Sequence, residues 1–274
     1  MEQLVDRHTA WRLALTLRRP GAESTLDAWP DGRSLPLGWH LVYCQESPGR
    51  DVMSPDGLPA HDASLPEHRY AQRLFGGASL EWRRAPRIGE VLRCEVVPGE
   101  FVEKQGRSGP LALYTFERRY WVGQELCVRE TNHVIYRPAQ LAEPTSVAAV
   151  PDRPPTPPTA AAGPWCDVGT VDIDEIDVFR LSALMFNSHR VHYDVAYAQG
   201  TEGHAGVLVQ AKLQLLLALE YLPPQASCRH LSYRAHQTLT APSTVTIQAC
   251  HAKDRQPLAL RVMKDDVTHF SLNL

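Results

Sequence analysis

The feature that most constrains this sequence is an apolar run from Val207 to Tyr221. Leucine, valine and alanine fill nearly every helical face of the run, so a helix formed here has to be almost wholly buried. The rest of the chain must therefore supply a sheet large enough to wrap around it. The polar interruptions are Gln210, Lys212, Gln214 and Glu220.

Short runs typical of strands, separated by Gly and Pro turns, lie on both sides of a proline-rich tract. Residues 79–84 and 91–97 echo residues 230–235 and 244–250, which indicates an internal duplication. A buried helix wrapped by antiparallel strands describes a hotdog fold. The expected class is α+β: a double hotdog, with two antiparallel sheets each wrapping a helix and the helix of the first half degenerate. Strands are expected over 78–82, 91–97, 111–121, 125–136, 168–173, 179–184, 229–238, 244–252, 258–264 and 267–272.

The proline-rich tract divides the chain into two halves. Residues 1–141 are expected to form an N-terminal hotdog-like half and residues 165–274 a C-terminal catalytic half, joined by an extended linker over residues 142–164. The first half has no equally apolar run, so its helix is expected to be broken or lost within residues 21–74. An amphipathic helix is expected over residues 2–17.

Composition excludes several classes of protein. A formal net charge of -3 gives no field that favours nucleic acid or an anionic membrane. No run of about twenty apolar residues is present to span a bilayer, and the N-terminus lacks a signal-peptide pattern, so we expect a cytoplasmic protein. The 6 cysteines include no Cys-x-x-Cys pair, which argues against a zinc cluster or a disulfide framework.

Polar chemistry concentrates in residues 187–194, shortly before the apolar helix. The start of a buried helix offers free N–H groups and a partial positive charge, which suit a thioester oxygen that becomes an enolate. Hydration of an enoyl thioester also needs a group that moves protons and a group that orients water. His192 can move the protons, and Asn187 or His189 can orient water. The N–H groups around Gln210 and Ala211 can hold the carbonyl oxygen.

The segment Ser182-Ala-Leu-Met-Phe-Asn187-Ser-His-Arg-Val-His192-Tyr-Asp194 resembles the active-site segment of MaoC-like double-hotdog dehydratases. That group includes mesaconyl- and itaconyl-coenzyme A hydratases and hydroxyacyl-thioester dehydratases. The resemblance implies a hydro-lyase that reversibly hydrates a 2,3-enoyl thioester without a cofactor. It also implies an acyl-CoA or acyl-carrier thioester as partner and leaves room for a homodimer. In the first half the similar stretches are 36–40, 75–78, 103–111 and 135–137.

Two positions depart from that family's pattern. The family commonly has a catalytic aspartate five positions before the histidine, where this chain has Asn187, an amide that cannot serve as a base. His192 would then carry the acid/base work, with Asn187 positioning the water. At the helix start the family commonly has His-Gly-Pro-Leu, where this chain has Gln210-Ala211-Lys212-Leu213. The backbone N–H of Ala211 retains the oxyanion contact, while the added methyl narrows the approach.

The cations near the expected site have a dual interpretation. Arg190, Lys212, Lys104 and Arg107 are candidates to pair with coenzyme phosphates or a substrate carboxylate, although most surface cations are simply solvated. Asp194 precedes a helical run and is expected to be an N-cap.

Other activities stay open at this stage. A metal site built from His189, His192 and His204 lacks a further ligand at diagnostic spacing, so no metal is expected. Hotdog folds also support thioesterases, and the departure at Gln210 and Ala211 is compatible with a non-enzymatic acyl-thioester binder.

Overall fold

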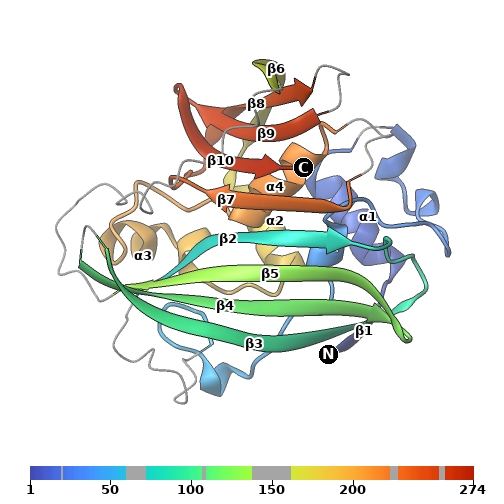
Figure 1. The fold of residues 1–274 in the computed structure, drawn as a ribbon, viewed down its shortest axis with the longest axis horizontal. Coiled ribbons are helices and arrows are strands. Elements are labelled where there is room, and N and C mark those ends of the chain that lie inside the picture. Colours follow the sequence, from blue (N-terminus) through green and yellow to red (C-terminus); the bar gives the residue numbers. More distant parts are fainter. Residues whose placement is uncertain (20, 60–71, 107–108, 138–161, 223–227, 253–256) are drawn as a thin grey trace.

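The structure is a computed structural model that describes residues 1–19, 21–59, 72–106, 109–137, 162–222, 228–252 and 257–274. Its strands form a 10-stranded antiparallel sheet in the order β1-β3-β4-β5-β2-β7-β10-β9-β8-β6 (Figure 1). The strands of the first half are β1 (Glu2–Leu4), β2 (Gln72–Trp82), β3 (Val91–Gly106), β4 (Gly109–Val122) and β5 (Glu125–Arg137). Those of the second half are β6 (Ala162–Ile173), β7 (His230–Ala235), β8 (Ser243–Ala252), β9 (Pro257–Lys264) and β10 (Val267–Asn273).

The two halves repeat one topology. In the first half, β3, β4 and β5 pair in succession, β5 also pairs with β2, and β1 pairs with β3. In the second half, β8, β9 and β10 pair in succession, β10 also pairs with β7, and β6 pairs with β8. This repetition agrees with the expected duplication and gives the α+β double hotdog. The expectation of two separate sheets needs a correction, because β2 pairs with β7 from Ala78↔Tyr233 to Glu81↔His230 and makes the sheet continuous.

Matching helices follow the first strand of each half. Helix α1 (Arg7–Thr16) follows β1, helix α2 (Glu175–Leu184) follows β6, and the two helices pack against each other. The helix expected over residues 2–17 is therefore preceded by a strand. The strand expected over residues 179–184 is wrong, because this segment belongs to α2. Asp174 and Asp177 form a capping box at the start of α2. Val178 and Leu181 follow at helical spacing, and both are buried.

The apolar run forms α4 (Ala211–Leu219), which is buried from Leu213 to Leu219 and packs against β7, β9 and β10. In Figure 1 it lies with α1 and α2 on one face of the sheet. Its counterpart in the first half is the single 3-10 turn η3 (Trp39–Val42), all of whose residues are buried. The first-half helix is thus degenerate, as expected. The other short helical segments of the described residues are the 3-10 turns η1 (Gly21–Ser24), η2 (Leu26–Ala28), η4 (Arg50–Val52) and η6 (Arg190–His192) and the α-helix α3 (Val195–Gly200).

The hydrophobic core is continuous across the halves: one cluster contains Leu13 and Leu80 of the first and Leu213 and Phe270 of the second. The expected linker lies outside the described residues up to position 161, and its last three residues, 162–164, begin β6. Within the described ranges, no helix combines the length and apolar character that a membrane crossing requires.

Candidate active site

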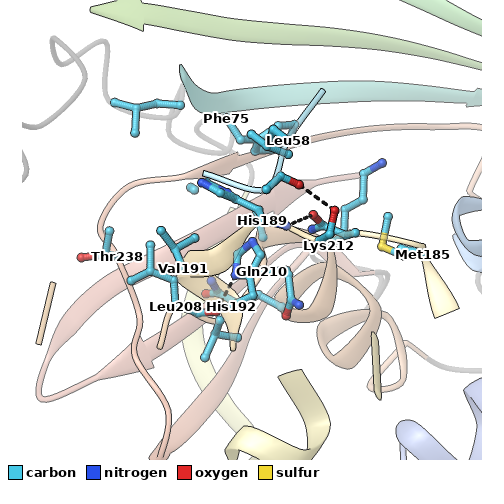
Figure 2. Close-up of a pocket in the computed structure, with 18 of the residues that line it drawn as sticks. Leu58, Phe75, Met185, His189, Val191, His192, Leu208, Gln210, Lys212 and Thr238 are labelled. Carbon is cyan, nitrogen blue, oxygen red and sulfur yellow. Dashed lines mark hydrogen bonds between the residues drawn. The ribbon is translucent and has the colours of Figure 1, made fainter. Parts of the chain in front are cut away.

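A cavity of about 450 Å³ opens at the start of α4, and both halves of the chain line it. The first half contributes residues of the 45–59 loop, the beginning of β2 and one residue each from β4 and β5. The second half contributes the 185–192 loop, the start of α4 and the chain that leaves β7 (Figure 2). The cavity therefore brings together the polar loop and the helix start that the sequence singled out.

His192 is held in one protonation state by its surroundings. Its Nδ1 lies 2.7 Å from the Leu208 carbonyl oxygen, and because a carbonyl only accepts, Nδ1 carries the hydrogen (Figure 2). Burial lowers the pKa of His192 to about 4, with further lowering from His189 and His204. The imidazole is thus neutral at pH 7, and its Nε2 is left as the basic nitrogen on a side chain that lines the cavity.

Asn187 and His189 stand beside His192 on the same loop. The Asn187 side-chain oxygen accepts the backbone N–H of His189 at 3.1 Å, which fixes the amide, and both residues line the cavity. The His189 and His192 rings meet edge to face with centroids 5.5 Å apart. Among the described residues no hydrogen bond is recorded for the Asn187 NH2 group, so it is available to donate.

The loop is closed by the expected cap. Asp194 accepts the backbone N–H of Tyr197 at 3.0 Å and caps α3, which confirms the structural interpretation of this carboxylate. The same side chain pairs with Arg190 at 2.7 Å. Arg190 also stacks on Tyr197 and does not line the cavity, so the structure gives it a role in holding the loop.

The start of α4 presents unused donors to the cavity. The Gln210 carbonyl accepts the N–H groups of Leu213 and Gln214. No acceptor is recorded within the described part of the chain for the N–H groups of Gln210, Ala211 and Lys212, as is usual for the first turn of a helix. All three residues line the cavity. These donors are where the sequence placed the oxyanion contact.

The side chain of Gln210 has a different task from its backbone. It is buried, and its Nε2 donates to the Val178 carbonyl at 2.9 Å and to Ser182 Oγ at 2.8 Å. Both acceptors belong to α2, so Gln210 fastens the start of α4 to that helix. The sequence alone did not reveal this contact.

Lys212 is not a solvated surface cation. Its Nζ lies 3.7 Å from Glu130 Oε1, a carboxylate with no exposed side-chain area on β5 of the first half. The other Glu130 oxygen accepts the Tyr120 hydroxyl at 3.3 Å. Sequence reasoning missed Glu130. The available signal was its place between the inward-facing Val128 and Asn132 on an alternating strand.

The remaining predicted binding residues are not brought to the cavity. Lys104 is exposed on β3 and does not line it, and Arg107 lies outside the described residues. Arg118 on β4, which sequence reasoning did not single out, does line it. No group of three or more potential metal ligands is found in the described ranges.

A smaller cavity of about 260 Å³ occupies the corresponding place in the first half. The smaller cavity is lined by residues of η3, of the end of β2 and of the segment just before β7. The larger cavity is lined by the equivalent parts of the other half, which are the start of α4, the end of β7 and the start of β2. Its histidine, His40, packs edge-on against Tyr120 and Trp82, and burial lowers its pKa to about 4. The two cavities are thus related by the internal repeat.

Comparison with known proteins matches this architecture to one family. A family model described as hydroxyacyl-thioester dehydratase type 2 matches residues 38–241. A mesaconyl-C4-CoA hydratase of Chloroflexus aurantiacus is 35% identical over 207 residues, covering 76% of this chain and 69% of the relative. A solved MaoC-like dehydratase shares the fold with a TM-score of 0.66 at 14% identity, covering 99% of this chain and 94% of that one. HtdX of Mycobacterium tuberculosis does so with a TM-score of 0.63 at 14% identity, covering 99% and 96%. The chain therefore belongs to the hydroxyacyl-thioester dehydratase type 2 family and is an enzyme of the hydro-lyase class.

Proposed function

We propose that this enzyme reversibly adds water to the 2,3-double bond of a coenzyme A-linked enoyl thioester with a short acyl group, such as mesaconyl- or itaconyl-CoA. One observation carries the proposal: a histidine with a basic Nε2 and the unused N–H groups of a helix start line the same cavity. The name of the 35% identical relative supports an acyl-CoA substrate. Catalysis belongs to the second half, residues 165–274, and residues 1–141 supply much of the cavity wall.

The proposed reaction uses His192 as the only proton carrier. Its Nε2 accepts a proton from water while the water oxygen bonds to the carbon β to the thioester. The electron pair of the double bond then moves to the thioester oxygen as an enolate, which the N–H groups of Gln210 and Ala211 stabilise. The protonated His192 returns the proton to the α carbon, the thioester carbonyl re-forms, and the histidine is neutral again.

Asn187 positions the attacking water in this proposal. Its oxygen is engaged by the His189 N–H, so the amide hydrogen atoms are the groups that face the water. A water that donates to His192 and accepts from Asn187 presents its remaining lone pair to the substrate. An amide serves this purpose as well as an acid would, because His192 alone takes the proton.

The first test is the substitution His192→Ala. Removal of a principal acid/base lowers turnover by about 10²- to 10⁴-fold, measured as the loss of conjugated enoyl absorbance with crotonyl-, mesaconyl- and itaconyl-CoA. The matched control is His8→Ala, which removes an exposed histidine of α1. A loss of less than about tenfold in His192→Ala is too small for this role and would sink the assignment.

The product distinguishes the hydratase from its alternatives. A thioesterase of the same fold releases free coenzyme A, which a thiol reagent detects, and leaves the double bond in the acid. A non-enzymatic binder retains the thioester unchanged while it saturates. Hydration yields a 3-hydroxyacyl thioester with the thioester bond intact.

A further inference from the structure

Two of the cations on the wall of the larger cavity, Lys212 and Arg118, lie near one buried carboxylate, Glu130. Lys212 from α4 and Arg118 from β4 line the cavity, whereas Glu130 lies outside the lining and faces Lys212. Arg118 pairs at 2.9 Å with Glu46, which lines the cavity as well and whose side chain is 53% exposed. The two cations thus come from different halves of the molecule and converge on one region of the cavity.

Lys212 and Glu130 form a pair of opposite charges beside the cavity. Lys212 and Arg118 hold the pKa of the buried Glu130 carboxyl below its usual range despite burial. Burial lowers the pKa of Lys212, and the Glu130 carboxylate opposes this effect. Arg118 has a closer partner in Glu46, so Lys212 is the cation of this cluster whose carboxylate partner is distant. An anionic ligand would stabilise a cation placed in this way.

The Lys212–Glu130 contact leaves hydrogen-bonding capacity unused. At 3.7 Å it is an ion pair but too long for a hydrogen bond, and Glu130 Oε1 is buried without a hydrogen-bond partner among the described residues. The ammonium group of Lys212 has three N–H donors. The Lys212 side chain is 20% exposed and lines the cavity, so these donors have access to a bound ligand.

We propose that Lys212, supported by Arg118, binds a free carboxylate on the acyl group of the substrate. This assignment rests on the proposed function, since it describes one end of the same acyl-thioester site. It selects dicarboxylic acyl thioesters, with the thioester oxygen held by the first N–H groups of α4 and the carboxylate held by a side chain of the same turn. Holding both groups from a single helical turn favours a short diacid.

The test compares two ligands that cannot be hydrated. The first is 2-methylsuccinyl-CoA with the thioester at C4, and the second is 3-methylbutanoyl-CoA, in which a methyl group replaces the carboxylate. Calorimetry measures the Kd of each for the wild-type protein, for Lys212→Met, and for the control Lys264→Met on β9, outside the cavity lining. Since no turnover is involved, the result is independent of whether the proposed hydration is correct.

The expected result is a preference of the wild-type protein for the carboxylated ligand of at least about tenfold, as hydrogen bonds to charged groups typically give. Lys212→Met removes most of this preference, and Lys264→Met keeps it. Equal binding of the two ligands by the wild-type protein overturns the proposal, and so does a preference that survives in Lys212→Met. If Lys212→Met fails to fold because Glu130 is left unpaired, the double variant Lys212→Met/Glu130→Gln removes both charges and is judged by the same ratio.

Discussion

At the scale of single residues, the proposed reaction depends on a histidine that stays neutral. Burial disfavours the imidazolium, while the Leu208 carbonyl holds Nδ1–H and opposes this effect only in part. A neutral base buried in a cavity accepts a proton from water without first losing one to solvent. The histidine is therefore ready to act over the whole neutral range of pH.

This state predicts the pH dependence of the reaction. The pKa of His192 is about 4, against about 6.5 for a free histidine, so kcat/KM stays level from about pH 8 to pH 5 and falls with an apparent pKa near 4. The measurement is kcat/KM for an enoyl-CoA across that range. An acid limb centred between about pH 6 and 7 would contradict the assignment.

Folding stability is also expected to fall as the pH falls, so it has to be measured as a control for the pH dependence of activity. His192 and His40 both titrate near pH 4 in the folded protein and higher when unfolded. The unfolded state thus binds more protons between about pH 6.5 and 4, and stability falls as the pH falls through this window. Thermal unfolding at each pH shows whether the enzyme is still folded where the activity is measured.

These residues show which parts of the site can be predicted from the sequence. That His192 and Asn187 lie together could be predicted because they belong to one short segment, and the cap at Asp194 is confirmed. Glu130 could not be joined to Lys212, because their contact depends on how the two halves meet. The hydrogen bonds of the Gln210 side chain could not be predicted either, because their acceptors lie on α2, whose last part was expected to be a strand.

At the scale of elements, a first-half loop supports the loop that carries the proposed catalytic residues. Ser188 Oγ donates to the Gly57 carbonyl at 2.6 Å, and the Arg190 backbone N–H donates to the Asp56 carbonyl at 2.8 Å. Gly57 has φ +85°, and a Cβ on it would lie 2.0 Å from the Ser188 carbonyl oxygen. The two loops can approach this closely only because residue 57 is glycine.

This contact predicts a loss of activity in Gly57→Ala. The methyl group pushes the 187–192 loop away, and displacement of a reacting group by about 1 Å costs about 100-fold in rate. Gly32→Ala is the matched control, because Gly32 has φ +83° but nothing within 4 Å of its Cβ position. Both variants carry similar backbone strain, so equal turnover in the two would show that the loop contact does not matter.

Helix α4 is held at its start by the Gln210 side chain, which predicts a stability effect. Gln210→Leu keeps the size and leaves the Val178 carbonyl and Ser182 hydroxyl without this donor, which lowers the free energy of unfolding by about 1 to 3 kcal/mol. Urea denaturation measures the change. Gln199→Leu, in exposed α3, loses one surface hydrogen bond and is expected to change the stability by less than about 0.5 kcal/mol.

The secondary structure was predictable where local signals dominate. The alternating strands of the hairpins follow from periodicity, and α4 follows from its continuous apolar run. Helix α2 was misassigned because the exposed apolar residues Ile176 and Phe179 obscure the helical spacing of its buried residues. The joining of β2 to β7 pairs residues far apart in the chain, and no local pattern encodes it.

At the scale of the whole molecule, the joined sheet and shared core predict that the two halves unfold together. The pairs between β2 and β7 and the common hydrophobic cluster would be lost if one half unfolded alone. Urea denaturation followed by tryptophan fluorescence reports mainly on the first half, because every tryptophan except Trp165 precedes residue 141. Hydrogen exchange of β8 to β10 reports on the second half. Coincident midpoints are expected, and separated midpoints would show independent halves.

The joined sheet also determines which strand edges are left open to a further strand. Pairing β2 with β7 consumes the inner edge of each half, which leaves β1 and β6 at the ends of the sheet. Strand β1 is only 3 residues long, so β3 continues beyond it with exposed Glu100, Glu103 and Lys104 and a register shift after Pro98. Strand β6 carries Pro164 and two register shifts of its own. Charge, proline and irregular register all discourage a further strand from adding to a sheet, so we expect any self-association of this enzyme to use a face or a loop instead of a sheet edge.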